Sequence, residues 1–121
     1  MLPPLIYYGK SGLEAQIFQT YMASSGYQVQ TVLTRDGVLE AIGMQPNAIT
    51  VIALDKSPVE LTELAGELRV RAKDSSNPIF LLGGDEPFDP RMDSVYVITR
   101  PFRLSEVITR IQSISRHKKD R

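Results

Sequence analysis

Cysteine is absent from this chain of 121 residues, and histidine occurs once, at His117. The absence of cysteine excludes disulfide bonds, thiolate metal sites and cysteine nucleophiles. The single histidine lies in a basic stretch at the C-terminal end, so the sequence offers no Ser-His or Cys-His arrangement for nucleophilic catalysis. We therefore expect a protein that is not an enzyme and that carries neither a cofactor nor a metal site.

An excess of charge of either sign is also missing, because fourteen basic side chains balance fourteen acidic ones. A formal net charge of zero provides no overall field that would attract nucleic acid or an anionic membrane. Long apolar runs are absent too: the longest, Ile49–Leu54, is far shorter than a membrane span. The N-terminal segment lacks the early basic residues of a signal peptide. We expect a soluble, cytoplasmic protein that binds neither nucleic acid nor membranes.

The apolar residues that are present alternate between strand and helix patterns. Short apolar or alternating runs predict strands at 5–8, 27–33, 48–54, 79–82 and 95–99, and helical spacing predicts helices at 13–22, 38–42, 59–73 and 104–114. Strands that alternate with helices indicate an α/β fold, here a three-layer doubly wound (βα)5 sandwich with a five-stranded parallel sheet. The length suits one domain, predicted over residues 1–115, and residues 116–121 read as a polar tail or the start of a linker.

One segment interrupts this alternation. Between the fourth and fifth strands lies the sequence DEPFDPRMDS, which contains Pro87 and Pro90. Proline fits the first turn of a helix but not its interior. The helix expected at this place is therefore predicted to be shortened or missing.

The most informative motif is VYVITRPFRLSEV at residues 95–107. It reads as a buried strand, an Arg100-Pro101-Phe102 turn and an amphipathic helix with Ser105 near its N-terminal cap. A basic residue followed by Pro-Phe between the last strand and the last helix resembles the receiver domains of bacterial two-component response regulators. The resemblance extends along nearly the whole chain and implies a flavodoxin-like fold.

The same resemblance implies that most of the phosphorylation site is degenerate. Gly9 and Lys10 occupy the places of two acidic residues that hold magnesium in the family, and Ile52 occupies the place of the phosphoacceptor aspartate. Gly83 stands where a serine or threonine contacts the phosphoryl group, and Arg100 replaces a lysine. The chain thus resembles a degenerate member, or pseudo-receiver, without the carboxylate, metal and cations that phosphoryl transfer needs.

Two alternatives remain open for this site. In the first, Asp55 is the phosphoacceptor at the end of a strand with a small insertion, and the receiver is still phosphorylated with an unusual dependence on metal. In the second, Gly9 to Gly12 and Arg100 bind an anion or a nucleotide at the carboxyl ends of the strands.

The function implied by the resemblance is a phosphorylation-independent signalling and protein-interaction module, an atypical receiver domain of a bacterial regulator. Its partner would be another signalling protein or an output domain in the same chain, and we expect a monomer or a weak dimer. Phe88, Met92 and Tyr96 are predicted to form an exposed apolar contact patch for that partner. In the alternative interpretation, Phe88 and Met92 cover the core where the helix is missing.

Overall fold

Five short strands form one parallel sheet in the order β2-β1-β3-β4-β5. The computed structural model describes residues 2–10, 12–72, 77–83, 88–100 and 102–119. The strands are β1 (Leu5–Gly9), β2 (Val29–Val32), β3 (Ile49–Ala53), β4 (Ile79–Leu82) and β5 (Val95–Ile98). The almost wholly apolar strand β3 lies in the middle of the sheet, where both of its faces are covered. The predicted α/β fold with a five-stranded parallel sheet is confirmed.

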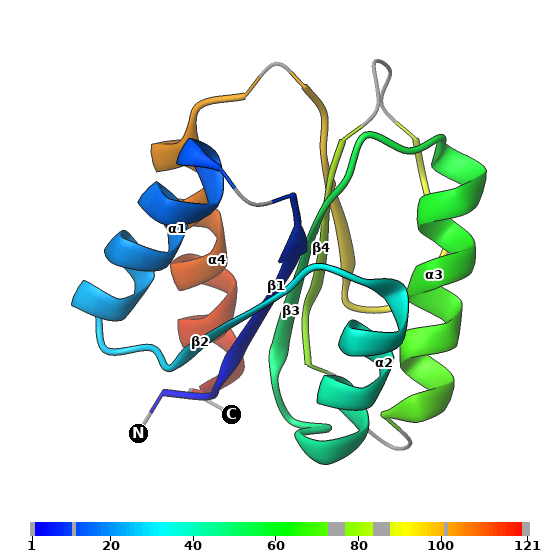
Figure 1. Cartoon of the computed structure of the whole chain (residues 1–121), viewed down its shortest axis with the longest axis horizontal. Coiled ribbons are helices and arrows are strands. Elements are labelled where there is room, and N and C mark those ends of the chain that lie inside the picture. Colours follow the sequence, from blue (N-terminus) through cyan, green and yellow to red (C-terminus); the bar gives the residue numbers. More distant parts are fainter. Residues whose placement is uncertain (1, 11, 73–76, 84–87, 101, 120–121) are drawn as a thin grey trace.

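Two helical layers cover the sheet, with α1 and α4 on one face and α2 and α3 on the other (Figure 1). The helices are α1 (Leu13–Ser24), α2 (Arg35–Met44), α3 (Pro58–Arg71) and α4 (Leu104–Lys119). Because successive side chains of a strand point to opposite faces, each layer has its own core. Tyr7 of β1 lies in the core under α1 and α4, and Tyr8 lies in the core under α2 and α3.

The ends of the helices follow from local side chains. Thr34 caps α2 by accepting a hydrogen bond from the backbone N–H of Gly37, and Ser57 caps α3 by accepting one from Glu60. α2 therefore begins at Arg35, earlier than predicted, and extends to Met44, two residues beyond its predicted end at residue 42. The last helix also exceeds its prediction, because α4 continues to Lys119 and includes most of the predicted polar tail. The predicted domain boundary at residue 115 stays a prediction.

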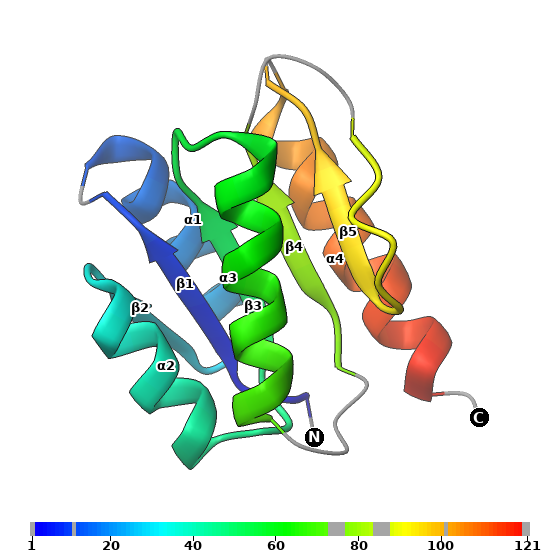
Figure 2. The same cartoon turned by 90° about the vertical axis from the view of Figure 1, so that its right-hand side faces the viewer.

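The connection between β4 and β5 contains no helix over residues 88–94, as the prolines predicted. Residues 84–87 lie outside the described part of the chain. Arg91 and Ser94 have positive φ angles of 54° and 60°. Arg69 of α3 donates hydrogen bonds to the carbonyl oxygens of Asp93 and Ser94, at 3.1 Å each. In Figure 2 this segment runs beside β5. The hydrogen bonds of Arg69 connect the segment to α3.

None of the described helices is both long and apolar enough to cross a membrane.

Candidate functional site

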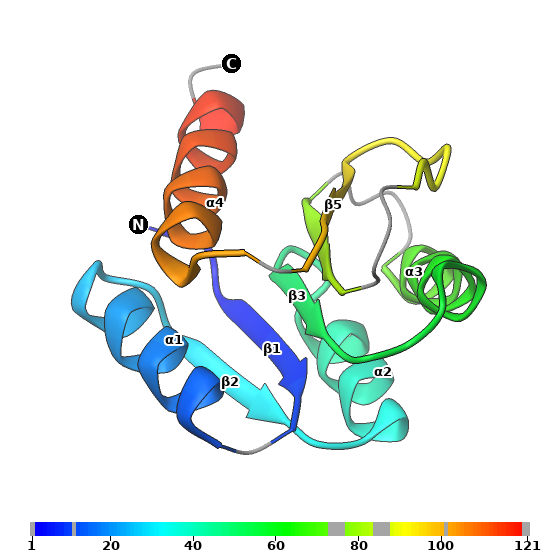
Figure 3. The same ribbon diagram turned by 90° about the horizontal axis from the view of Figure 1, so that it is seen from above.

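The carboxyl edge of the sheet brings together most of the positions that the sequence singled out. Figure 3 looks down on this edge, where β1, β3, β4 and β5 end. Gly9 is the last residue of β1, Gly83 directly follows β4, and Arg100 follows β5 by two residues. In open α/β sheets ligands bind at this edge. The predicted positions therefore lie at one end of the fold. The contacts around them determine which ligands or reactions this end can support.

The two glycines of this edge lie directly against the backbone that ends β3. A methyl group on Gly83 would lie 2.5 Å from the carbonyl oxygen of Leu54. A methyl group on Gly9 would lie 3.0 Å from the carbonyl oxygen of Ala53 and 3.0 Å from the ring of Tyr7. Backbone atoms thus fill the space into which a side chain at either position would project. At Gly83 the backbone would have to move to admit a side chain, and at Gly9 the fit would be tight.

Ile52 and Asp55, the two candidates for the phosphoacceptor position, lie in different surroundings. Ile52 is fully buried in the core between β3 and the layer of α2 and α3. Asp55 is exposed in the loop between β3 and α3, two residues before Ser57, which caps α3. Ile52 therefore lies in the core, and Asp55 lies in a loop two residues after the end of β3. Which of them corresponds to the family's aspartate stays a prediction.

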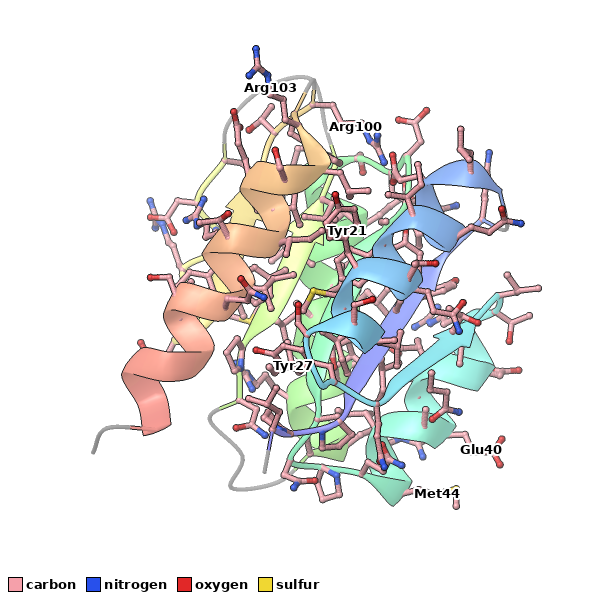
Figure 4. All side chains as sticks on the ribbon, turned by 90° about the vertical axis from the view of Figure 1, so that its left-hand side faces the viewer. Tyr21, Tyr27, Glu40, Met44, Arg100 and Arg103 are labelled. Atoms are coloured by element: carbon pink, nitrogen blue, oxygen red, sulfur yellow. The ribbon has the colours of Figure 1, made fainter. Side chains whose placement is uncertain are left out.

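Arg100 is held by a partner that the sequence did not suggest. Its guanidinium forms two hydrogen bonds with the carboxylate of Glu14, Nη1 to Oε2 at 3.2 Å and Nη2 to Oε1 at 3.1 Å. The hydroxyl of Tyr7 donates to the same Oε1 at 3.3 Å, and the guanidinium lies 4.8 Å from the ring centre of Phe102. Figure 4 shows Arg100 beside the start of α1. A two-pronged contact of this kind orients the arginine as well as pairing its charge.

The electrostatics of this cluster follow from its geometry. The hydrogen bonds to Glu14 raise the pKa of Arg100 against the opposing effect of burial, and the charge of Asp55 adds a smaller contribution in the same direction. Burial, followed by the negative charge of Glu14, raises the pKa of the Tyr7 hydroxyl. Arg100 therefore has its counter-charge within the fold, from Glu14.

The sequence alone does not reveal that Glu14 and Tyr7 contact Arg100, because no local motif distinguishes either residue. Glu14 looks like an ordinary acidic residue in the first turn of a helix, and Tyr7 like one of several apolar residues in a strand. Arg100 lies 86 positions from Glu14. A contact over that separation is visible only after the fold is known.

A metal site and an anion site find little support at this edge. Over the described ranges, no group of three or more histidine or acidic residues is placed to hold a metal ion. Lys10 is exposed just after β1. The alternative anion site would need the loop that contains Ser11, which lies outside the described residues, and an arginine that Glu14 already engages.

The three residues of the predicted partner patch do not lie together. Phe88 and Met92 are partly buried against the core under α2 and α3, as is Val97. Tyr96 lies on the opposite face of the sheet, where its ring stacks on Phe80 with 5.3 Å between the ring centres. Phe88 and Met92 thus pack on one side of the sheet and Tyr96 on the other. Their role in binding a partner stays a prediction.

Comparisons with known proteins agree on the fold. No family model and no curated protein sequence matches the chain. Among solved structures it is similar to a response regulator receiver protein from Sinorhizobium medicae, with 15% identity, 95% of each chain covered and a TM-score of 0.72. It is similar to the chemotaxis protein CheY4 of Vibrio cholerae at 15% identity, 93% and 98% coverage and a TM-score of 0.70. The pseudo-receiver domain of the CikA protein matches at 16% identity, 92% and 95% coverage and a TM-score of 0.62. The chain therefore has the fold of receiver domains.

Proposed function

We propose that this chain is a receiver-fold signalling module of a bacterial, cytoplasmic regulator, and that it works by protein interaction without phosphorylation. The observation that carries the proposal is the closed carboxyl edge, where Gly9 and Gly83 lie against the carbonyl groups of Ala53 and Leu54. The similarity of the fold to receiver domains, one of them described as a pseudo-receiver, supports the signalling role.

Phosphoryl transfer needs a nucleophilic carboxylate, a divalent cation and positive charge aimed at the phosphoryl oxygens. At this edge the carboxylate of Asp55 lies in an exposed loop. Magnesium requires oxygen ligands such as carboxylates, and β1 ends in Gly9 and Lys10 instead. Among the residues of this edge that the structure describes, Arg100 supplies positive charge, and no group of three acidic residues is placed to hold a metal ion.

That positive charge is itself engaged. For Arg100 to reach a phosphoryl group, it would have to leave both oxygens of Glu14 and the ring of Phe102. Leaving them would cost two charge-assisted hydrogen bonds and would leave the partly buried carboxylate of Glu14 without its cation. The bridge therefore favours one fixed arrangement of the edge. A fixed arrangement suits a module whose partner, a signalling protein or an output domain of the same chain, binds it constitutively.

The test is an amide-resolved NMR titration of the whole chain, first with magnesium and then with beryllofluoride, a mimic of an acyl phosphate. We expect the amide signals of Gly9, Asp55, Gly83 and Arg100 to keep their positions up to about 10 mM of each, a concentration that would saturate sites with millimolar affinity. The matched control is Asp55→Asn, titrated in the same way. Shifts at these amides that disappear in Asp55→Asn would overturn the proposal.

One observation favours a second candidate, a receiver that is still phosphorylated on Asp55. Asp55 is exposed at the correct edge of the sheet, and its charge contributes to the raised pKa of Arg100. This candidate predicts that an acyl phosphate donor adds one phosphoryl group to the wild-type chain and none to Asp55→Asn. Intact-mass spectrometry of both proteins distinguishes the two candidates.

A further inference from the structure

A hollow with a volume of about 270 Å³ lies beside the first turns of α3, on the side of the sheet that α2 and α3 cover. In Figure 2 these turns of α3 extend beyond the start of α2. The floor of the hollow consists of largely buried side chains from β1, the loop after β3 and α3: Tyr8, Leu54, Leu61 and Leu64. Its rim consists of charged residues: Arg35, Lys56, Glu60, Glu63 and Glu67. This space, here called the α3 hollow, thus combines an apolar floor with a charged rim.

Tyr8 brings a polar group without a partner to this floor. Only 9% of Tyr8 is exposed, and its hydroxyl makes no hydrogen bond with any residue in the described parts of the chain. The neighbouring tyrosine of β1 differs, because the hydroxyl of Tyr7 donates to Glu14. A hydroxyl that is withdrawn from water without a partner costs free energy. A ligand in the α3 hollow that bonds to the Tyr8 hydroxyl would remove this cost.

The rim of the α3 hollow has one carboxylate more than it has cations. Arg35 pairs with Glu67, and the amino group of Lys56 lies 3.8 Å from the carboxylate of Glu60. Glu63 lies between these two glutamates on the same side of the helix, and it forms no ion pair with a residue that the structure describes. Three acidic residues against two basic ones leave the rim with a net charge of −1, which is located at Glu63.

Charges outside the hollow do not reverse this balance. The other described charges of α2, of α3 and of the loops after β1 and β3 are three basic and three acidic residues: Lys10, Arg69, Arg71, Asp36, Glu40 and Asp55. None of these six lines the hollow, and Arg69 donates to carbonyl groups of the β4–β5 connection. The α3 hollow therefore favours a ligand that carries one positive charge.

A more open groove continues from the hollow along the seam between α2 and α3. Its volume is about 520 Å³. It shares Glu63 and Glu67 with the hollow, and its other lining residues are Leu39, Gly66, Val70 and Arg71. Val70 is 68% exposed, and a methyl group on Gly66 would meet nothing within 4 Å. From Glu60 to Arg71 the helix rises about 16 Å, which is the length of about five residues of an extended chain.

We propose that the α3 hollow receives an arginine side chain of a partner protein, whose neighbouring residues lie along the α2–α3 groove. The proposal rests on the proposed function as a protein-interaction module and gives the chemistry of the partner. The aliphatic stem of the arginine packs on Leu61, Leu64 and the ring of Tyr8, and its guanidinium donates to Glu63 and to the hydroxyl of Tyr8. Arginine has five N–H donors and no acceptor, which matches a site whose free groups accept hydrogen bonds.

The size of the hollow favours a single side chain over a larger free ligand. Pockets for small molecules usually measure roughly 300–1,000 Å³, and the α3 hollow is slightly smaller. A guanidinium also stacks on aromatic rings, which an ammonium group does less well. Because the carboxylates of the rim are exposed to solvent, their attraction for a cation is modest. We therefore expect a short peptide to bind with a dissociation constant of about 1–10 mM.

An amide-resolved NMR titration of the whole chain tests the proposal. The probe is an acetylated peptide of about five residues, with arginine at its centre and alanine elsewhere. The amide signals of Leu61 and Leu64 in the hollow and of Gly66 and Val70 in the groove should shift. The same peptide with citrulline, which keeps the shape of arginine without its charge, should bind at least about fivefold more weakly.

Three variants locate the binding site. Glu63→Gln removes the unpaired charge and should weaken binding of the arginine peptide at least about fivefold, and Tyr8→Phe should weaken it about threefold. Glu40→Gln is the matched control, because Glu40 is an exposed acidic residue of α2 that does not line the hollow. It should bind like the wild type. Thermal unfolding verifies that each variant is folded.

Three results would overturn the proposal: no shift of these amides at about 20 mM peptide, equal binding of the citrulline peptide, or equal weakening by Glu40→Gln and Glu63→Gln. Propylguanidine, which is the arginine side chain without its backbone, should bind more weakly than the peptide because it makes no contact with the groove. Equal affinity would instead assign the hollow to a free organic cation. The titration with magnesium and beryllofluoride reports on Gly9, Gly83 and Arg100, so failure of the peptide to bind leaves phosphorylation independence standing.

Discussion

At the scale of single residues, the backbone groups that surround Gly9 and Gly83 restrict which side chains these two positions can accept. Reading the sequence against the receiver pattern indicated that an acid and a hydroxyl were missing at these positions. The sequence could not indicate that the carbonyl groups of Ala53 and Leu54 lie where side chains at these positions would project. That arrangement depends on how closely the neighbouring strands approach each other. A larger side chain at Gly83 therefore conflicts with the backbone, and one at Gly9 is tightly confined.

We predict that Gly83→Ala lowers the free energy of unfolding by about 1–3 kcal/mol, because its methyl group would meet the carbonyl oxygen of Leu54 and force the backbone to move. The gain of about 0.4–1 kcal/mol from a less flexible unfolded chain is too small to offset that strain. Urea unfolding at neutral pH measures the difference.

The control for this prediction is Gly66→Ala in α3, where a methyl group would meet nothing within 4 Å. It should raise the free energy of unfolding by about 1 kcal/mol, since alanine favours a helix interior. A Gly83→Ala variant as stable as Gly66→Ala would show that the carboxyl edge has room for a side chain.

Tyr7 is predicted to make stability fall at high pH. Its pKa lies above the ordinary value of 10.0, so the folded protein keeps the hydroxyl proton where the unfolded chain has lost it. The unfolded state then binds fewer protons than the folded state, and the free energy of unfolding decreases as pH rises past 10. Between pH 10 and 11 the loss should reach about 1 kcal/mol.

Chemical unfolding at pH 8 and at pH 11 measures this effect in the wild type and in Tyr7→Phe. The wild type should lose about 1 kcal/mol more than Tyr7→Phe over that interval. Tyr21→Phe is the control, because it removes the hydroxyl of a tyrosine that is exposed on α1. Equal losses in the wild type and Tyr7→Phe would contradict the prediction.

At the scale of elements, the connection from β4 to β5 is stabilised by α3. Residues 88–94 form no helix, so their backbone carbonyls lack the hydrogen bonds that a helix would supply. Arg69 provides two of these bonds, to Asp93 and Ser94, and burial of its guanidinium lowers the pKa of Arg69. Arg69 thus supplies hydrogen bonds to two carbonyl groups that a helix would otherwise satisfy with its own backbone.

We predict that Arg69→Met lowers the free energy of unfolding by about 1.5–3 kcal/mol, the usual range for hydrogen bonds from a charged donor. Methionine keeps much of the aliphatic packing, so the loss reports on the guanidinium. Hydrogen exchange should also become faster at Val95 and at Ile79, whose amide donates to the carbonyl of Ser94.

Arg71→Met is the control for this substitution, because Arg71 is exposed on the same helix. It should change stability by less than about 0.5 kcal/mol. If the two variants are equally stable, the contact with Asp93 and Ser94 contributes nothing measurable.

The sequence predicted the elements better than their ends. Apolar runs at 5–8, 48–54 and 79–82 identified strands that the structure confirms, since a strand buried on both faces must be apolar throughout. The start of α2 was missed because Thr34 caps it four residues before its first buried residue, Val38. The extension of α4 to Lys119 was missed because residues 116–119 are all polar in the sequence, so the apolar helical spacing stops at Ile114.

At the scale of the whole molecule, the layers were predictable and the contacts between distant segments were not. Strands that alternate with helices permit few topologies, and the observed strand order is one of them. The bridge from Glu14 to Arg100 and the separation of Tyr96 from Phe88 depend on which face each residue occupies and on its three-dimensional neighbours. A single sequence gives no direct signal for such long-range contacts.

The bridge between Glu14 and Arg100 also bears on how the chain folds as it is synthesised. β1 and α1 leave the ribosome before β5, and the cation that pairs with Glu14 follows it by 86 residues. The buried side of α1 shares its core with Val107 and Ile111 of the last helix. β1 and α1 therefore gain their full set of polar and apolar partners only once β5 and α4 have been synthesised. A polypeptide stopped before β5 would leave α1 without these partners, so this domain completes its fold only after α4 has emerged.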